Sequence, residues 1–471
     1  MAVRSSSRHR HTPHSCIRRR FRGRSTVPHT GDEWTEGRDR HRHDNSDHDA
    51  PLTEHERPHG QQERLISLCD IVAGLESRGV SRRRILASLA IGAAATATAA
   101  ACSSDADTGG GGVALDARPY GPEPYANQRT RLILLGTSGG PPYWPGGTRE
   151  GIASAVVVDD RFYLIDAGHG VMRQLRNAKL GRNYDTDFDG PLDVLAGVFL
   201  THLHSDHIVD LNNILSEGMY NGLQFVNRIP IWGPGNRGQV PPFFGGGTPP
   251  APVNPENPTP GTREMADLLV QAFAADFNDR LFDNAKPRPE QMWEAKDVPV
   301  PAQYLSDPNG QPCPEMDPFV FFEDDHVKVS ATLVNHAPVF PALAYRFDTP
   351  DGSIVFSGDT GKNPNLVPLA RNADVLVHEV IDKSWPESLF PEPRDAKQES
   401  IFQHLINAHT LVEDVGRVAQ EASVKTLALS HIVPGNGADE RFEAARDGFD
   451  GKLIIGRDLD VIGVGAPRSG G

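Results

Sequence analysis

The segment Thr201-His-Leu-His-Ser-Asp-His207 decides the fold, because it directly follows the apolar run 195–200, which predicts a buried strand. Residues two apart on an extended segment share a face, so His202 and His204 can reach one metal ion together. The last two residues of the segment follow a bend and can point at a second ion. Imidazole and carboxylate are groups that Zn²⁺ accepts as ligands. A lone His-x-His pair is a weak signal, whereas this longer motif behind a strand predicts a metal centre.

Four further motifs accompany this segment, in an order that resembles the metallo-β-lactamase superfamily. They are Leu164-Ile-Asp-Ala-Gly168, Val334-Asn-His336, Phe356-Ser-Gly-Asp-Thr360 and Leu429-Ser-His-Ile432. The resemblance covers about residues 130–465 and is weakest over 233–317. It implies that Asp166 braces the metal loop and that Asp359 bridges two metal ions.

The resemblance also implies a ligand set for each ion. Site one would consist of His202, His204, His336 and Asp359, and site two of Asp206, His207, Asp359 and His431. The metal would be Zn²⁺, with Mn²⁺ or Fe accepted by the same ligands. Two ions this close activate a hydroxide near neutral pH, so the implied reaction is hydrolysis without a covalent intermediate.

Two features indicate the branch of the superfamily. The bridging position is Asp359, whereas true β-lactamases of this fold place a Cys at the second zinc, which disfavours antibiotic hydrolysis. Val377-His-Glu-Val380 and Ala408-His-Thr410 resemble ribonuclease Z and its exported relatives, the arylsulfatase-like and cyclic-nucleotide phosphodiesterase-like proteins. In that branch a Glu orients a His that protonates the leaving group. The candidate catalytic residues are therefore Glu379, His409 and the ligand Asp206.

The opening Leu134-Leu-Gly-Thr-Ser-Gly-Gly-Pro141 and the arginine behind it, Arg149, also resemble this branch. Two roles remain open for Arg149, pairing with an acid near the metals or contact with an anionic substrate.

The apolar patterns along the chain predict a four-layer αβ/βα sandwich, with two sheets face to face and helices outside. Strands are expected at 131–135, 153–158, 161–165, 195–200, 319–322, 327–333, 342–347, 353–356, 375–377 and 426–429. Helices are expected at 171–180, 208–220, 398–422 and 440–448, and one more from Met265 to Phe277 inside a Pro/Gly-rich insertion at about 233–317.

The N-terminal part of the chain has a composition of its own. Residues 1–64 are rich in Arg, His and Asp and poor in aliphatic residues, so we expect them to be disordered or to precede the true start. A basic nucleic-acid-binding arm is the sharper alternative, although acidic residues nearly balance the arginines there. Residues 103–128 form a linker, and the hydrolase domain spans 129–471.

Residues 65–102 resemble a twin-arginine export signal. Ser81-Arg-Arg-Arg84 precedes an Ala-rich apolar run at 86–101, and Cys102 follows as in a lipoprotein box. The run is shorter than the roughly 20 residues that span a bilayer. We therefore expect export, to the cell envelope through a lipid on Cys102 or to the outside as a secreted protein.

Charge guides the choice of substrate. The formal net charge is −15, and residues 234–320 carry six Lys plus Arg against twelve Asp plus Glu. Affinity for tRNA depends on phosphate contacts from basic residues, so nucleic acid is disfavoured as a partner.

The preferred function is hydrolysis of a small anionic or aryl ester, such as a sulfate ester or a phosphodiester. One alternative is a ribonuclease Z-type endonuclease that processes the 3′ end of tRNA. Another is a lipid-anchored binding protein with a structural zinc site, against which the Glu–His pair argues. The leaving group and the oligomeric state are left open.

Overall fold

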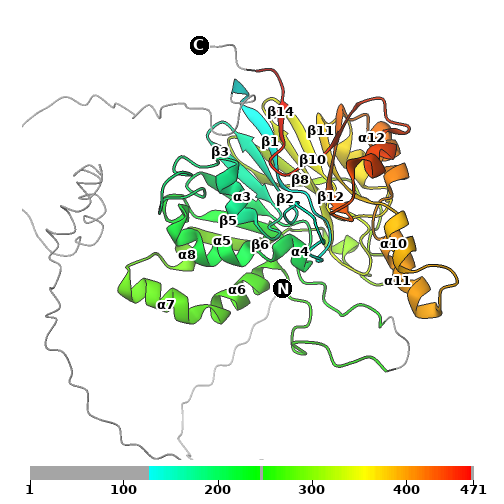
Figure 1. Cartoon of the computed structure of the whole chain (residues 1–471). Coiled ribbons are helices and arrows are strands. Elements are labelled where there is room, and N and C mark those ends of the chain that lie inside the picture. Colours follow the sequence, from blue (N-terminus) through cyan, green and yellow to red (C-terminus); the bar gives the residue numbers. More distant parts are fainter. Residues whose placement is uncertain (1–126, 244–247, 468–471) are drawn as a thin grey trace, which may run out of the picture. The chain divides into compact units, whose positions relative to one another are not determined.

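The computed structural model describes residues 127–243 and 248–467, and two seven-stranded sheets form its centre (Figure 1). The first sheet has the order β14 (Val461–Val464), β1 (Thr130–Gly136), β2 (Ala153–Val158), β3 (Arg161–Ile165), β4 (Leu195–Phe199), β5 (Ile229–Gly233), β6 (Trp293–Asp297). The second has the order β13 (Lys452–Ile455), β12 (Thr426–Val433), β11 (Val375–Ile381), β10 (Gly352–Phe356), β9 (Leu343–Thr349), β8 (Lys328–Leu333), β7 (Phe319–Glu323). The segment 1–64 and the export signal at 65–102 lie outside the described residues, and their assignments stay predictions.

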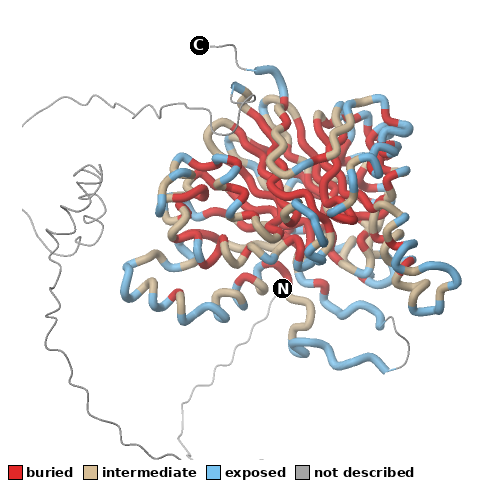
Figure 2. The backbone as a smooth tube through the Cα atoms, in the orientation of Figure 1, coloured by how far each residue is buried: buried red, intermediate tan, exposed pale blue. Residues whose placement is uncertain are grey.

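Side chains that alternate along the strands hold the two sheets together. In β1, Leu132 and Leu134 belong to the core between the sheets, whereas Ile133 and Leu135 belong to the core on the outer face. Aromatic rings fill much of the space between the sheets, for example Phe199 of β4 against the second sheet. Figure 2 shows the same pattern as buried backbone along the central strands.

Helices cover the outer face of each sheet. The outer core of the first sheet includes side chains of α3 (Val171–Asn177), α5 (Leu211–Glu217), α6 (Thr262–Ala272), α7 (Ala274–Asp283) and α8 (Pro289–Met292). That of the second includes α9 (Leu366–Ala370), α12 (Val412–Glu421) and the 3₁₀ segment η5 (Asp439–Arg446). The remaining helical elements are α4 (Ser205–Ile208), α10 (Ser384–Leu389), α11 (Ala396–Asn407), η2 (Gly218–Tyr220), η3 (Leu223–Phe225) and η4 (Ala302–Tyr304). The predicted four-layer αβ/βα sandwich is confirmed.

The helical stretch predicted at 398–422 is broken in the structure. Helix α11 ends at Asn407 and α12 begins at Val412, and the four residues between them run along the edge of β11. There Ile381 donates its N–H to the carbonyl of Thr410 at 3.0 Å, and Leu411 pairs with Ile381. Helical periodicity continues across the break, so the sequence pattern could not reveal it.

The range predicted as an insertion contributes to the first sheet. Strand β6 lies inside 233–317 and pairs in parallel with β5, which makes β6 the edge strand. Neither β5 nor β6 was expected from the sequence, because Pro230 in β5 and the charged residues of β6 are atypical of strands. The single helix expected from Met265 to Phe277 is two helices, α6 and α7, which meet at Phe273.

Among the described residues, no helix combines the length and the apolar character that a membrane crossing requires.

Candidate metal centre and active site

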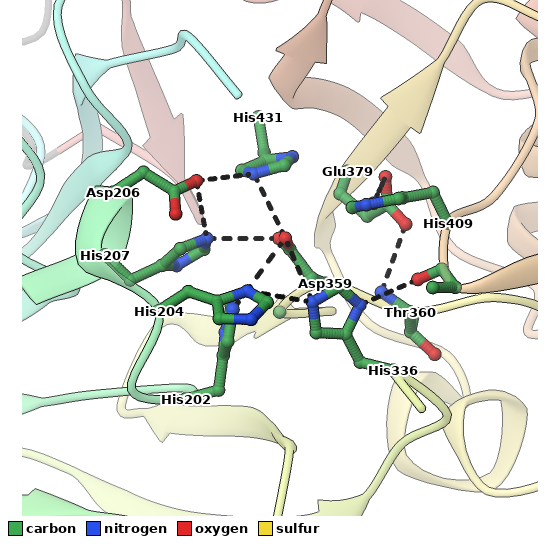
Figure 3. A network of polar contacts seen from close by, with 12 residues as sticks. His202, His204, Asp206, His207, His336, Asp359, Thr360, Glu379, His409 and His431 are labelled. Atoms are coloured by element: carbon green, nitrogen blue, oxygen red, sulfur yellow. Dashed lines mark hydrogen bonds and ion pairs between the residues drawn. The ribbon is translucent and has the colours of Figure 1, made fainter. Parts of the chain in front are cut away.

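The candidate ligands lie at the ends of strands from both sheets (Figure 3). His202 follows β4, His336 follows β8, Asp359 follows β10, and His431 lies within β12. Helix α4 presents Asp206 and His207 just beyond His204. Strands are held at both neighbours, so loops at their ends place side chains with little freedom.

The structure brings the seven predicted ligands together in two groups, within each of which one ligand atom per residue lies within 4.8 Å of the others. The first group is His202, His204 and His336, and the second is Asp206, His207, Asp359 and His431. These groups match the two sites inferred from the sequence, apart from the shared aspartate. The assignment of each residue as a ligand stays a prediction.

Asp359 faces both groups. One carboxylate oxygen, Oδ1, lies 3.3 Å from Nε2 of His207. The other, Oδ2, lies 3.1 Å from Nε2 of His431, 3.8 Å from that of His336 and 3.9 Å from that of His202. Asp359 is 3% exposed, so these nitrogens replace water around it. A carboxylate in this position can bridge two cations.

Asp166 braces the metal loop through two neighbours. Its Oδ1 accepts the N–H of Thr201 at 2.7 Å, and Oδ2 accepts the ring Nδ1–H of His207 at 2.9 Å. Because Nδ1 of His207 carries the proton, Nε2 is left as the bare nitrogen that faces Asp359. An outer partner that sets the tautomer in this way is typical of metal-binding histidines.

His336 is oriented in the same manner. Its Nδ1 donates to the backbone carbonyl of Ala408 at 2.9 Å, so its Nε2 has a free lone pair. That nitrogen lies 3.2 Å from Nδ1 of His204. Two imidazole nitrogens this close, with Asp359 beside them, form an arrangement that a cation stabilises.

Two residues of the centre have unusual backbone conformations. The φ angles of Asp166 and His431 are +58° and +46°, in the left-handed region that non-glycine residues seldom adopt. Such strain persists only where surrounding contacts hold it, and it concentrates at functional sites. The backbone N–H of Gly140, which lies 3.2 Å from Nε2 of His431, supplies one such contact.

Buried polar atoms that form no hydrogen bond test whether metal ions fit here. Nε2 of His202, Nε2 of His207 and Oδ1 of Asp359 are buried and make no hydrogen bond to any described residue, although the last two lie 3.3 Å apart. An unpaired buried polar atom costs about 1–3 kcal/mol, and one interior rarely concentrates several. All three atoms have lone pairs of the kind that bind Zn²⁺, and they point toward the same space. The centre therefore fits a dinuclear metal site.

The electrostatics of the centre favour neutral imidazoles in the first group. Burial lowers the pKa of His202 and His204, and lowers that of His336 to about 3. A neutral imidazole is the form that binds a metal. Burial also acts on His207, but the surrounding carboxylates raise its pKa well above the usual value, so a proton occupies that position where no metal does.

A second pair, Glu379 and His409, lies beside the ligands. Nδ1 of His409 is 3.3 Å from Oε2 of Glu379, and the other carboxylate oxygen accepts the N–H groups of Thr360 and Thr410, at 3.1 and 2.8 Å. Burial lowers the pKa of His409, yet the Glu379 carboxylate outweighs it and raises the pKa to about 9. The imidazole thus keeps a proton at neutral pH, as a general acid must.

Two irregularities bring this pair to the centre. The parallel pairing of β11 and β12 shifts at Glu379, where one residue of β11 opposes two of β12, and a bulge of this kind re-aims a side chain. The break between α11 and α12 places His409 against His431, whose ring it stacks on at 5.8 Å between centroids. Neither irregularity has a sequence signal of its own.

Some residues of the site were missed by sequence reasoning. Thr201 contacts Asp166 through both its backbone and its hydroxyl, and Thr410 donates its hydroxyl to the carbonyl of Thr360 at 2.6 Å. His378 is buried with Nε2 unpaired among the described residues, while its Nδ1 donates to the carbonyl of Glu379. Only the position of Thr201 just before the histidine motif could have indicated a role.

Arg149 lies apart from the candidate ligands. Its guanidinium donates to the hydroxyl of Thr137, the carbonyl of Gly456 and the carboxylate of Asp439. Pairing with an acid near the metals is therefore not the arrangement seen, because the partner Asp439 is not among the candidate ligands.

The two packed sheets, with a His/Asp cage at the strand ends and a Glu–His pair beside it, define a metallo-hydrolase of the metallo-β-lactamase fold. Residues 148–273 match the Metallo-beta-lactamase superfamily, a span that includes the His202–His207 segment.

Proteins that are similar to this chain along the whole folded region indicate a narrower class of enzyme. The chain is 29% identical to "Ribonuclease Z" of Mycobacterium bovis (strain BCG / Pasteur 1173P2) over 340 residues, which cover 71% of this chain and 98% of the relative. It is also 29% identical over 341 residues to "Ribonuclease Z" of Mycobacterium marinum, covering 71% and 99%. The crystal structure of human tRNase Z, short form, aligns over 71% of this chain and all of that chain, with 18% identity and a TM-score of 0.45.

These relatives overturn two expectations from the sequence. The preference for a hydrolase of small esters, arylsulfatase-like or phosphodiesterase-like, is wrong, because the relatives that match along the folded region are ribonucleases Z. The view that nucleic acid is disfavoured as a partner is wrong for the same reason. Both errors rest on charge counts, the net charge of −15 and the acidic excess over residues 234–320, which omit the metal ions. Bound divalent ions are the largest local charges in such a site.

Proposed function

We propose that this protein is a ribonuclease Z-type endonuclease, which hydrolyses a phosphodiester bond near the 3′ end of precursor tRNA. The similarity to ribonuclease Z along 98% of the relative's length carries the proposal. The Glu379–His409 pair supports it, because a purely structural metal site has no use for a protonated imidazole at its edge. Either bond that can break in an RNA phosphodiester leaves a ribose alkoxide, a leaving group that needs a proton.

The residues divide the work by position. We assign His202, His204 and His336 to one ion and Asp206, His207 and His431 to the other, with Asp359 shared. The ions, which we propose to be zinc, supply Lewis-acid activation of water and positive charge for the scissile phosphate.

The proton for the leaving group comes from His409. Glu379 holds Nδ1 of this imidazole, which leaves Nε2–H as the donor toward the departing ribose oxygen. Two backbone N–H groups fix the other oxygen of Glu379, so the carboxylate cannot rotate away from His409. A well-oriented general acid usually increases the rate of such a reaction by about 10²–10⁴-fold.

Cleavage of a precursor tRNA tests the proposal. The full chain, loaded with zinc, is incubated with a precursor that carries a 3′ trailer, and the new ends are mapped. We expect one cut next to the acceptor stem, absent with Asp359→Ala. Mature tRNA serves as the uncleaved control. Turnover of an aryl sulfate or aryl acetate by the same preparation, with the precursor left intact, would refute the proposal.

A further inference from the structure

An exposed aromatic ring lies on the loop between β1 and β2. The side chain of Tyr143 is 78% exposed, although its neighbour Trp144 is anchored. The indole N–H of Trp144 donates to the carbonyl of Gly139 at 3.0 Å, and its ring meets Trp385 of α10 edge-on at 5.2 Å. The loop is therefore held at Trp144, while the next ring along it is left open to solvent.

His169 supports the open ring from one side. The ring centroids of Tyr143 and His169 are 4.6 Å apart, with their planes tilted by 35°. This contact occupies one face of the phenol and restricts its rotation, so the other face is available in a defined orientation. A surface ordered before binding costs less entropy when a ligand arrives.

A pocket of about 210 Å³ adjoins the ring, and its lining includes Ser138, Trp144, Glu150 and Gly435. The hydroxyl of Ser138 is buried and has no hydrogen-bond partner among the described residues. A Cβ on Gly435 would lie 2.4 Å from that hydroxyl and equally close to the Trp144 ring, so only glycine leaves this space open. The pocket thus offers an aromatic platform, with Arg149 and Glu150 also on its lining.

The pocket is next to the metal centre. Ser138 pairs with Ile432, the neighbour of His431, and the N–H of Gly140 lies 3.2 Å from the His431 ring. Tyr143 is three residues further along, which limits it to about 11 Å from Gly140. On the other wall, His169 follows Gly168, at which a Cβ would lie 2.5 Å from the carbonyl of Asp206.

We propose that Tyr143, supported by His169, is a stacking subsite for an unpaired nucleobase close to the scissile phosphodiester. Glu150, whose carboxylate is accessible on the pocket lining, faces the edge of the base. The subsite rests on the proposed function for the identity of its ligand, an RNA. Every base has a π-face, so stacking accepts any sequence. It also requires no positive charge, which suits a chain with a net charge of −15.

Steady-state kinetics separates stacking from other roles of the loop. Tyr143→Ala should raise KM for precursor tRNA about 5- to 100-fold, which corresponds to the usual worth of one base–aromatic stack. Tyr143→Phe keeps the ring and should keep the wild-type KM. With methyl p-nitrophenyl phosphate, which carries no base, both variants should match wild type. Phe282→Ala, a change at an exposed ring on α7 outside the pocket, is the matched control.

A binding measurement is independent of cleavage. A short RNA that contains 2-aminopurine is titrated with zinc-loaded full chain, and stacking on Tyr143 should quench its fluorescence. Quenching should vanish with Tyr143→Ala and persist with Tyr143→Phe. An uncut precursor tRNA together with this quenching pattern would refute the proposed function and leave the subsite standing. Absent quenching with wild type, an unchanged KM in Tyr143→Ala, or an equal loss in Tyr143→Phe would overturn the subsite.

Discussion

Asp359 is the residue on which both halves of the metal centre depend. Its two oxygens face His207 on one side and His202, His336 and His431 on the other, at 3.1–3.9 Å. Asp166 is one step further out, since it contacts His207 and Thr201 and no other candidate ligand. Substitution of the two aspartates should therefore reduce metal binding and turnover to different extents.

Asp359→Ala should abolish turnover and lower the metal content of the chain from near two ions to one or none. Asp166→Asn should be milder, with about a 10- to 100-fold loss, as is usual when an outer partner of a ligand is removed. Metal analysis by mass spectrometry and turnover on one substrate check both variants. A larger loss in Asp166→Asn than in Asp359→Ala would contradict the bridging role.

The role of His409 can be tested by comparing substrates whose leaving groups do and do not need a proton. His409→Ala should lose about 10²–10⁴-fold on RNA, whose ribose alkoxide needs a proton. On a nitrophenyl phosphodiester, whose leaving group departs without one, the loss should stay below about tenfold. Paired rate measurements on the two substrates, with metal content verified, check this. Glu379→Gln should show the same selectivity in a weaker form. Equal losses on both substrates would mean that His409 supports the structure and not the proton transfer.

At the scale of elements, the 233–317 region is tied to the loop that follows β8. Arg237 donates to the carbonyl of Pro338 at 2.6 Å, and also to those of Gln239 and Pro308. Burial lowers the pKa of this guanidinium. Pro338 is two residues from His336, so this contact links the inserted region to the first group of ligands.

Arg237→Met should lower the free energy of unfolding by about 1–3 kcal/mol, because it removes the hydrogen bonds of a buried guanidinium and leaves the buried carbonyl of Pro308 without its donor. Urea denaturation of the zinc-loaded chain measures the change. Arg288→Met, which removes an exposed ion pair with Glu290, is the control and should change stability by less than about 1 kcal/mol. Equal stability of the Arg237 variant and wild type would show that the contact contributes nothing.

At the scale of the whole molecule, the metal centre joins the two sheets. Its ligands come from loops after β4, β8 and β10 and from β12 itself, so ions bound there cross-link both halves of the sandwich.

Chelation should therefore lower the melting temperature by several degrees, since free metal at 100 times its Kd stabilises a native site by about 2.7 kcal/mol. Differential scanning calorimetry before and after EDTA treatment measures the shift, and added zinc should reverse it. A chain shown to be free of metal that melts at the original temperature would contradict the cross-link.

The acidity of the chain predicts an unusual salt response for a nuclease. A protein that makes 6–10 phosphate contacts loses about 10³–10⁵-fold in affinity between 50 and 200 mM salt. Because this chain has a net charge of −15, its KM should rise by less than about tenfold over that range of salt concentration. Kinetics on precursor tRNA at several salt concentrations provide the slope. A steep slope would reveal a basic RNA-binding surface that the composition hides.

Much of the architecture was accessible from local pattern. The strands predicted at 153–158 and 161–165 coincide with β2 and β3, because two almost fully buried runs flank a short polar turn. The order of the histidine and aspartate motifs, each behind an apolar strand, predicted the fold class, and the structure confirms it. The seven candidate ligands were inferred from the family resemblance that these motifs carry.

The sequence by itself determined the fold class and most strands of the two sheets, because apolar runs bounded by polar turns predict buried strands. The motifs that follow those runs supplied the candidate ligands through the family resemblance. Only the tertiary structure decided how Glu379 and His409 meet, because the bulge in β12 opposite Glu379 and the break after α11 depend on hydrogen bonds between distant segments. It also decided that β6 joins the first sheet and that Tyr143 stands open beside His169. A charge count could not identify the substrate, because it sums residues over the whole chain, whereas recognition depends on the few groups that surround the metals.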